Sequence, residues 1–450
     1  MPTLMVSISG VRGIIGDGLD PETILKYTSA YADFCGKGKI VIGSDGRVSG
    51  DMVKHNIIGT LLAKGNDVID LGVCPTPTVL FNVKKLIAAG GIAISASHNG
   101  NEWNALKLLN NDGEFLTPKQ NTEMLKLLNQ PPFHYKHRNE LGKLTHSGYG
   151  LKDHVDAVLG MKYIDVKSIK KRKFTVLLDC VNGAGAYVMP DLLKELGCHV
   201  VEMNCEKTGI FPRSPEPILE NLTETMKAVK NNDADIGIVV DPDVDRLVLI
   251  TEKGEPFGEE YTITQVVKFI LSKEKGNVVI NLSTTRAVED VAGEFGCKVF
   301  RAPVGEANVV KKMKEIGAVI GGEGSGGIIY PAIQYARDAL AGTVITLQHL
   351  REFKGNISKM KKSLPCYIIA KRKIEIGNKN PDLIISKLIE KYSVQMINTE
   401  DGLRIDFPDH WVHFRKSNTE PIIRCIAEAK DANLVNCYIE KYMAEINSIN

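Results

Sequence analysis

The chain has 450 residues, more than one hydrophobic core usually organises, so we expect three or four domains. Its hydrophobic content of 43% and charged content of 24% are those of an ordinary soluble globular protein. The net charge of +2 gives no argument for nucleic acid or an anionic membrane as a partner.

From the sequence we expect neither a signal peptide nor a membrane-spanning segment. Its first residues lack a basic segment followed by a long apolar one, and no apolar run is long enough to span a bilayer. The 9 cysteines are scattered without a Cys-x-x-Cys pair, which is typical of free thiols in a reducing compartment. We therefore expect a cytoplasmic protein.

One pattern of predicted elements occurs three times along the chain. A β-branched run ends in a polar loop at residues 39–46, 174–185 and 277–285. A helix-like stretch follows and ends at a glycine with a valine three places on, at Gly65, Gly197 and Gly296. A second apolar run then leads into another polar loop, at residues 91–95, 235–240 and 316–320. Strands that alternate with helices predict layered α/β domains, whose ligands bind at the carboxyl ends of the strands.

The pattern changes after about residue 364. A helix-like run over 381–392 precedes a hairpin-like stretch with the turn pair Asp401-Gly402, then a strand and a closing helix. This order predicts a smaller α+β domain. The polar segment 129–150 reads as a connector between the first two repeats. The predicted domains are therefore residues 1–150, 151–254, 255–365 and 366–450.

The loop of the second repeat is acidic. Asp241, Asp243 and Asp245 alternate, so an extended loop places all three on one side. Three converging carboxylates cannot all stay ionised without a cation, and hard oxygen ligands indicate Mg²⁺. An EF-hand is disfavoured because Arg246 stands where that turn needs glycine and the flanks read as strands. A solvated acidic turn without metal is the simpler alternative.

The loop of the first repeat contains Ser97, His98 and Asn99. A serine at a strand end can act as a nucleophile or phosphoryl carrier, although most Ser-His neighbours are ordinary turn residues. A hydrolase triad is disfavoured because no Gly-x-Ser-x-Gly elbow is present. Lys107, ten residues further on, is a candidate proton donor or acceptor if its pKa is lowered.

The third loop is rich in glycine. Its spacing Gly322-x-Gly324-x-x-Gly327 matches a dinucleotide fingerprint, but a helix does not follow, and the chain contains no P-loop. Glu323 and Ser325 could instead bond sugar hydroxyls.

The last loop combines basic and hydroxyl side chains. The residues are Arg415, Ser417, Asn418, Thr419 and Arg424. They predict a binding site for a dianion such as phosphate, because arginine side chains match phosphate geometry. A basic surface turn explains them equally well.

Taken together, the four loops resemble those of the α-D-phosphohexomutase family, in the same order and across essentially the whole chain. The matching motifs are Ala96-Ser97-His98-Asn99, Asp241-Pro242-Asp243-Val244-Asp245-Arg246, Gly322-Glu323-Gly324-Ser325-Gly326 and Arg415-Lys416-Ser417-Asn418-Thr419-Glu420-Pro421. Two opening segments, Ser9–Gly13 and Gly43–Arg47, also look like family segments.

The resemblance implies three similar α/β domains with mixed sheets and a mobile C-terminal α+β domain around one central cleft. It implies a covalent phosphate on Ser97 and one Mg²⁺ per active site. The implied metal ligands are phospho-Ser97, Asp241, Asp243 and Asp245. The implied catalytic residues besides Ser97 are Arg12, Lys107 and Arg246, with His98 as a less favoured acid or base.

The implied substrate contacts come from the other two loops. Glu323 and Ser325 would hold the 3- and 4-hydroxyls of the sugar, and the loop at Arg415–Thr419 with Arg424 would hold the phosphate that is not reacting. Two positions depart from the family: Gly100 replaces a frequent proline, and Gly327 replaces a frequent histidine, which leaves acid–base work to Lys107 or His98.

The expected enzyme is an intramolecular phosphotransferase that interconverts sugar 1- and 6-phosphates through a bisphosphorylated intermediate. Glucosamine phosphate is the favoured substrate, and mannose or glucose phosphate is the alternative. A catalytically inactive sugar-phosphate sensor is disfavoured because Ser97 and all three aspartates are present. A Mg²⁺ phosphatase with an aspartyl nucleophile would leave the other loops without a role. Small-molecule sugar phosphates are the expected partners, and the protein is expected to be a monomer or homodimer.

Overall fold

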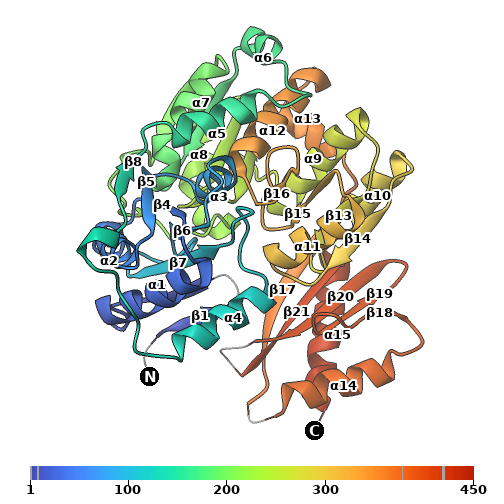
Figure 1. The fold of residues 1–450 in the computed structure, drawn as a ribbon. Coiled ribbons are helices and arrows are strands. Elements are labelled where there is room, and N and C mark those ends of the chain that lie inside the picture. Colours follow the sequence, from blue (N-terminus) through green and yellow to red (C-terminus); the bar gives the residue numbers. More distant parts are fainter. Residues whose placement is uncertain (1–2, 8–9, 378, 418–420, 450) are drawn as a thin grey trace. The chain divides into compact units, whose positions relative to one another are not determined.

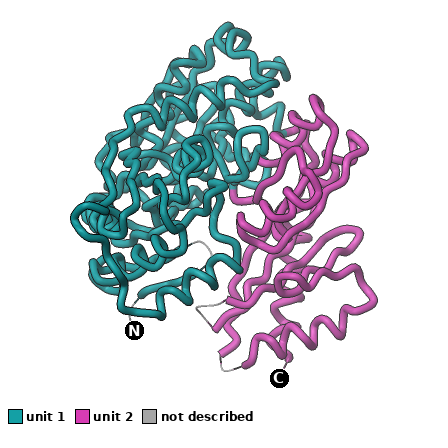
Figure 2. The backbone as a smooth tube through the Cα atoms, in the orientation of Figure 1, with its two compact units in different colours: residues 1–262, 326–361 teal, residues 263–325, 362–450 magenta. Residues whose placement is uncertain are grey.

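The computed structural model describes residues 3–7, 10–377, 379–417 and 421–449. They form two compact units, shown in Figure 2. Unit 1 comprises residues 1–262 and 326–361, and unit 2 comprises residues 263–325 and 362–450. Figure 1 labels their helices and strands.

The first sheet of unit 1 has the strand order β1-β2-β7-β6-β4-β5-β8, with β3 paired to β2. Its strands are β1 (Met5–Ser7), β2 (Gly10–Ile15), β3 (Gly18–Leu19), β4 (Lys39–Ser44), β5 (Asp67–Val73), β6 (Gly90–Ile94), β7 (Trp103–Leu109) and β8 (Leu144–His146). Its helices are α1 (Pro21–Cys35), α2 (Gly50–Ala63), α3 (Thr76–Lys85) and α4 (Pro118–Leu128). Strand β4 is parallel to β5 and β6, whereas β7 runs antiparallel to β6 and β2, so the sheet is mixed.

Part of the segment expected to be a connector belongs to this sheet. Strand β8 pairs in parallel with β5, and a short 3₁₀ helix (Arg138–Glu140) precedes it. All three residues of β8 are exposed, so they show no alternation of apolar and polar side chains from which a strand could be predicted.

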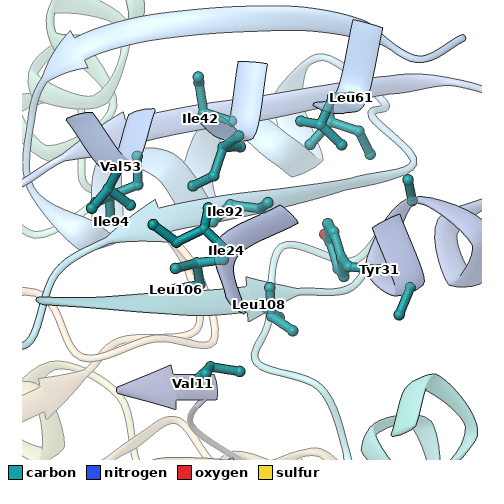
Figure 3. Close-up of a cluster of buried hydrophobic side chains, with 14 of the residues drawn as sticks. Val11, Ile24, Tyr31, Ile42, Val53, Leu61, Ile92, Ile94, Leu106 and Leu108 are labelled. Carbon is teal, nitrogen blue, oxygen red and sulfur yellow. The ribbon is translucent and has the colours of Figure 1, made fainter. Parts of the chain in front are cut away.

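Alternating side chains place helices on both faces of the sheet. Ile42 of β4 packs in the cluster formed with α1 and α2, and its neighbour Val41 packs in the cluster formed with α3. Figure 3 shows the first cluster, in which Leu106 and Leu108 of β7 lie among residues of the neighbouring strands and helices. Successive residues of a strand point to opposite faces, so Lys107 is directed away from this cluster.

The second sheet of unit 1 has the order β10-β9-β11-β12, with only β12 antiparallel. Its strands are β9 (Thr175–Asp179), β10 (His199–Met203), β11 (Ile236–Val240) and β12 (Leu247–Thr251). The helices in this part of the chain are α5 (Gly150–Leu159), α6 (Val166–Arg172), α7 (Met189–Glu195) and α8 (Thr223–Asn231), with 3₁₀ turns at Ala184–Tyr187 and Leu219–Asn221. Unit 1 also contains β16 (Gly327–Ile329) and α12 (Ala339–Phe353), and α13 (Ile357–Lys362) ends at its boundary.

In unit 2, three strands of a third sheet are parallel and lie in the order β14-β13-β15. Its strands are β13 (Val278–Asn281), β14 (Val299–Ala302) and β15 (Ile320–Glu323), with helices α9 (Glu259–Lys273), α10 (Ala287–Glu294) and α11 (Glu306–Ile316). In all three sheets the first strand of the repeat lies between the next two parallel strands of its repeat. The threefold repeat predicted from sequence is confirmed.

One predicted strand of this repeat is wrong in position. Residues 316–320 were expected to form it, but Ile316 ends helix α11 and Gly317 adopts a left-handed conformation with φ 61° that closes the helix. The strand begins only at Ile320 and ends at Glu323, which places that carboxylate at a strand end.

The C-terminal part of unit 2 is an antiparallel sheet in the order β17-β21-β20-β19-β18. Its elements are β17 (Ile368–Glu375), α14 (Pro381–Lys391), β18 (Met396–Asn398), β19 (Leu403–Asp406), β20 (His410–Lys416), β21 (Ile422–Ala429) and α15 (Ala432–Ser448). The predicted helix, hairpin and closing helix are present, so the α+β class is confirmed. The central cleft and the domain boundaries stay predictions. Among the described helices, none combines the length and apolar character needed to cross a membrane.

Tyr31 provides a test of the first core. Its buried hydroxyl donates to the carbonyl oxygens of Leu109 and Gly91, at 2.6 and 2.9 Å. Tyr31→Phe leaves these buried acceptors without that donor, so urea denaturation should show a free energy of unfolding lower by about 1–3 kcal/mol. Tyr27→Phe is the control, since its half-exposed hydroxyl bonds none of the described residues. Equal stability of the two variants would contradict the assignment.

Candidate active site

Ser97 lies in the loop that follows β6 and is buried, with 4% of its surface exposed. Its φ of 50° is left-handed, a costly conformation for a residue other than glycine. The Ser97 amide donates to Ser95 Oγ at 2.9 Å, and Ser97 Oγ lies 3.3 Å from both Asp241 Oδ2 and His98 Nδ1. The serine hydroxyl is therefore held directly against the acidic loop.

Arg47 holds the serine loop in this conformation. Its guanidinium donates to four backbone carbonyl oxygens of the loop and its exit, those of Ser97, Asn99, Gly100 and Trp103. Asp45 pairs with Arg47 Nε at 2.8 Å, and both side chains are buried. A planar fork with five donors suits several carbonyls at once, which lysine cannot match.

The acidic loop begins where β11 ends, and its three carboxylates are all buried within 4.8 Å of one another. Asp241 Oδ1 accepts the backbone N–H groups of Asp245 and Arg246, both at 3.1 Å. Val244 has a φ of 61°, a rare conformation for a β-branched residue. The loop thus folds tightly around Asp241.

Fixed donors from three other elements reach two of these carboxylates. Lys107 Nζ on β7 donates to Asp243 Oδ2 at 2.5 Å and lies 3.8 Å from Asp245 Oδ2. Thr76 Oγ1, at the start of α3, donates to Asp243 Oδ2 at 2.6 Å. Arg337 Nη2 donates to Asp245 Oδ2 at 2.6 Å.

Burial and these charges set the protonation of the cluster. Burial, followed by repulsion from Asp245 and Asp243, raises the pKa of Asp241 well above its usual value. Burial would also raise the pKa of Asp243, but the charge and hydrogen bond of Lys107 outweigh it and lower that pKa. Burial likewise opposes the charge on Lys107, yet the neighbouring aspartates raise the pKa of its ammonium. Lys107 therefore does not have the lowered pKa on which its predicted role as a proton donor or acceptor depends.

The donor set suits a hard divalent cation. Asp243 Oδ1 and Asp245 Oδ1 are buried and bond no donor among the described residues. A buried carboxylate oxygen without a partner is costly, and a cation bound among the three side chains would remove that cost. The acidic loop can therefore hold a metal ion with carboxylate oxygens.

Basic side chains surround the serine. Arg12 on β2 donates from Nη1 to Asn99 Oδ1 at 2.7 Å. Arg246 lies 3.7 Å from Glu216 and 3.9 Å from Asp245. Burial, with the charges of Arg246 and Arg12, lowers the pKa of His98 to about 3. His98 is therefore neutral at pH 7.

Glu323 and Ser325 lie in unit 2. The Glu323 carboxylate is buried at the end of β15, and its Oε1 accepts from Asn281 Nδ2 and the Gly305 amide, both at 3.0 Å. Ser325 is partly exposed. These bonds fix the Glu323 side chain at the edge of the parallel sheet.

Arg415 is tied to the same part of unit 2. Asp401 Oδ2 pairs with Arg415 Nε and accepts the Val304 amide, both at 2.9 Å, and Val304 precedes the Gly305 that binds Glu323. Arg424 stands directly opposite Arg415 on the neighbouring antiparallel strand.

The remaining predicted residues of this loop are less informative. The Ser417 amide donates to the Ile422 carbonyl at 3.1 Å. Asn418 and Thr419 lie outside the described residues.

The structure therefore gathers the predicted residues in two groups. One group in unit 1 contains Arg12, Ser97, His98, Lys107, Asp241, Asp243, Asp245 and Arg246. The other, in unit 2, contains Glu323, Ser325, Arg415, Ser417 and Arg424. Sequence reasoning did not identify Arg47, Thr76, Arg337 or Asp401 as contributors. Only Arg47 gave a signal, because it ends a segment that resembles the family.

Known proteins match the chain over its whole length. Models of the phosphoglucomutase/phosphomannomutase family match in four parts: alpha/beta/alpha domain I at residues 5–134, domain II at 152–254, domain III at 259–367 and the C-terminal domain at 373–444. A phosphoglucomutase/phosphomannomutase of Thermococcus kodakarensis is 36% identical over 96% of each chain. A "Probable phosphoglucosamine mutase" of Pyrococcus horikoshii is 34% identical over 98% of this chain and 97% of its own.

Solved structures agree with this result. A phosphoglucomutase/phosphomannomutase family protein of Burkholderia thailandensis has a TM-score of 0.86 at 25% identity, covering 99% of this chain and 98% of its own. The chain belongs to the phosphoglucomutase/phosphomannomutase family, the α-D-phosphohexomutases. Both the predicted family and the predicted enzyme class, an isomerase that acts as a phosphotransferase, are confirmed.

Arg47→Lys tests the clamp on the serine loop. Lysine keeps the charge that pairs with Asp45 but loses the fork that bonds the loop carbonyls, so Ser97 should shift by a fraction of an ångström. We expect kcat to fall by about tenfold to a hundredfold with little change in KM, measured by steady-state kinetics. Arg172→Lys, on an exposed ion pair with Asp235, is the control. Unchanged kcat in the Arg47 variant would remove the clamp from the mechanism.

Proposed function

We propose that this chain is a phosphoglucosamine mutase that interconverts glucosamine 6-phosphate and glucosamine 1-phosphate through phospho-Ser97. The phosphoryl group leaves Ser97 Oγ for the free sugar hydroxyl. The sugar hydroxyl loses its proton as its O–P bond forms, Ser97 Oγ takes up a proton as its own O–P bond breaks, and a 1,6-bisphosphate results. Return of the other phosphoryl group to Ser97 Oγ gives the isomeric product. The observation that carries the proposal is the 3.3 Å approach of the buried Ser97 Oγ to Asp241 of the acidic loop.

The surroundings of Ser97 suit phosphoryl transfer. Such reactions pass through a loose transition state, so an enzyme contributes mainly position and charge neutralisation. Arg47 fixes the loop backbone, while Arg12 and Arg246 supply positive charge near His98, the residue that follows the serine. The Lys107 ammonium, bonded to Asp243 Oδ2, adds a further positive charge at the acidic loop.

We assign the cation of the acidic loop as Mg²⁺, held by Asp241, Asp243 and Asp245 together with an oxygen of phospho-Ser97. When bound, Mg²⁺ would withdraw charge from the transferring phosphoryl group. The two unpartnered carboxylate oxygens support this assignment.

Unit 2 would bind the rest of the substrate. Arg415, which pairs with Asp401, and Arg424 stand directly opposite each other as like charges on paired strands, and this concentration of positive charge suits an anion. We infer that they bind the phosphate that is not reacting, and that Glu323 and Ser325 bind the 3- and 4-hydroxyls. Both hydroxyls keep nearly the same place when the sugar turns over, so one set of contacts serves both half-reactions.

The choice of glucosamine rests on overall similarity to relatives such as the one from Pyrococcus horikoshii. The second candidate, a phosphomannomutase/phosphoglucomutase, is favoured by the relative of Thermococcus kodakarensis at 36% identity. Both candidates use the same phosphoserine chemistry.

Ser97→Ala tests the carrier role. The resting wild-type protein should be about 80 Da heavier than its sequence by intact mass spectrometry, and the variant should lack this increment and all turnover. Ser147→Ala is the control, since its hydroxyl bonds none of the described residues and should leave both properties unchanged. Retained turnover in Ser97→Ala would refute the phosphoserine mechanism.

Substrate choice is tested by kcat/KM for the 6-phosphates of glucosamine, glucose and mannose under one set of conditions. We expect the highest value for glucosamine 6-phosphate. A higher value for mannose or glucose 6-phosphate would replace our assignment with the second candidate and leave the phosphoserine mechanism intact.

A further inference from the structure

Arg337 and Gly327 form a matched pair beside the acidic loop. Strand β16 begins at Gly327, and an antiparallel bridge joins Ile329 to Arg337. The Asp338 amide also donates to the Ile328 carbonyl at 2.9 Å. The two stretches thus run side by side, and a side chain at 337 can cross diagonally over position 327.

The space over Gly327 is filled by the arginine itself. A Cβ placed on Gly327 would lie 2.3 Å from Arg337 Cδ and 3.1 Å from Arg337 Cγ. No real Cβ tolerates the first distance, so any side chain at 327 would move the arginine. The glycine is needed here for close approach, and its φ is not in the left-handed region.

The far end of the same arginine reaches the acidic loop. Arg337 Nη2 donates to Asp245 Oδ2 at 2.6 Å, and the two side chains are 12% and 2% exposed. The other oxygen of this carboxylate, Asp245 Oδ1, is buried and accepts no hydrogen bond from a described donor, and Arg246 Nε lies 3.9 Å from it. Arg337 therefore holds Asp245 Oδ2 in place. Because this bond fixes the orientation of the carboxylate, it also sets the position of Asp245 Oδ1.

The backbone at Arg337 is itself held in place. Asp338 caps helix α12 by accepting the amides of Leu340 and Ala341, and its Oδ2 lies 2.8 Å from Nε2 of the fully buried His154. The Ala339 amide donates to the carbonyl of Val244, the residue with the strained φ in the acidic loop. Residues 337–339 thus support the loop at two points.

We propose that Arg337 is a positioning residue for cation binding: it orients Asp245 as a ligand before the cation arrives, and Gly327 provides the space that this requires. This inference rests on the proposed metal site. Partners that orient a ligating side chain typically contribute tenfold to a hundredfold in metal affinity. A purely charge-neutralising arginine predicts the opposite result, because its removal would make the site more negative and bind a cation more tightly.

A double-mutant cycle with direct measurement of Mg²⁺ binding tests the pair. Isothermal titration of the metal-free full chain with MgCl₂ gives the Kd without any use of activity. Arg337→Ala should raise the Mg²⁺ Kd by about tenfold to a hundredfold, and Arg337→Lys, which keeps a charge on a similar stem, should raise it less. Gly327→Ala should also raise it, because the added methyl displaces the arginine without removing any polar group.

The two changes should not be additive. Once Arg337 is alanine, the methyl group at 327 has nothing to displace, so the double variant should match Arg337→Ala within about twofold. Gly59→Ala, a glycine with open space around its Cβ position, and Arg351→Ala, whose Nε donates to the Ser168 carbonyl, are matched controls and should leave the Kd unchanged. Thermal unfolding in EDTA checks that each variant is folded.

Three results would overturn the proposal. An unchanged or lower Mg²⁺ Kd in Arg337→Ala would mean that the arginine only neutralises charge and does not position Asp245. If Gly327→Ala leaves the Mg²⁺ Kd unchanged, or if the effects of the two changes on the Kd add in the double variant, the two positions are not coupled. If the wild-type chain does not bind Mg²⁺, the metal site of the proposed function fails together with the inference. By contrast, if the wild-type chain binds Mg²⁺ and the variants bind it with the same Kd, the metal site is supported and only the role of Arg337 and Gly327 is rejected.

Discussion

Three carboxylates are buried within 4.8 Å of one another on a single loop, and the rest of unit 1 is arranged so that this concentration of negative charge is tolerated. Isolated buried charges are too costly to keep, so each must be paired, bonded or neutralised. Asp241 is bonded by the amides of its own loop, and its pKa is raised. Asp243 depends on Lys107 and Asp245 on Arg337, which come from distant parts of the chain. Lys107 points to the face opposite the core of Figure 3 because its neighbours on β7, Leu106 and Leu108, face that core and successive residues of a strand alternate.

The serine loop and the acidic loop share a second constraint, because each contains a residue with an unfavourable backbone conformation. Ser97 and Val244 both have positive φ values, a conformation that costs of order 1–3 kcal/mol for such residues and persists only when the surroundings enforce it. Arg47 enforces it in the serine loop through four carbonyl oxygens, and the Ala339 amide supports it in the acidic loop through the Val244 carbonyl. In both loops the strain is balanced by donors from outside the loop. The site is therefore built by tertiary contacts as much as by its own motifs.

The contrast between local motifs and the tertiary contacts that support them explains how much could be predicted from the sequence. The repeat, the α+β end and the positions of Ser97 and the aspartates follow from local patterns, because a strand that runs into a polar loop is visible within about ten residues. The supports were not predictable in the same way: Arg337 lies 92 positions from Asp245, and only folding reveals that Gly327 leaves it room. The misplaced strand at 316–320 has a local cause, since an apolar run there is shared between the end of α11 and the start of β15. The exposed strand β8 carries no pattern at all.

Residues 323–339 run from the proposed sugar-binding loop to the arginine that bonds Asp245 of the acidic loop. Glu323 opens the stretch with a carboxylate fixed by Asn281 and Gly305, and Arg337 lies near its end, bonded to Asp245. Between them, the Gly326 carbonyl accepts the amide of Leu247, and a Cβ at Gly326 would lie 2.4 Å from the Leu247 carbonyl oxygen, so the chain here lies directly against the strand that leaves the acidic loop. A substitution between Gly326 and Arg337 therefore bears on the segment that holds Asp245, because this segment contacts the acidic loop through both its backbone and its arginine.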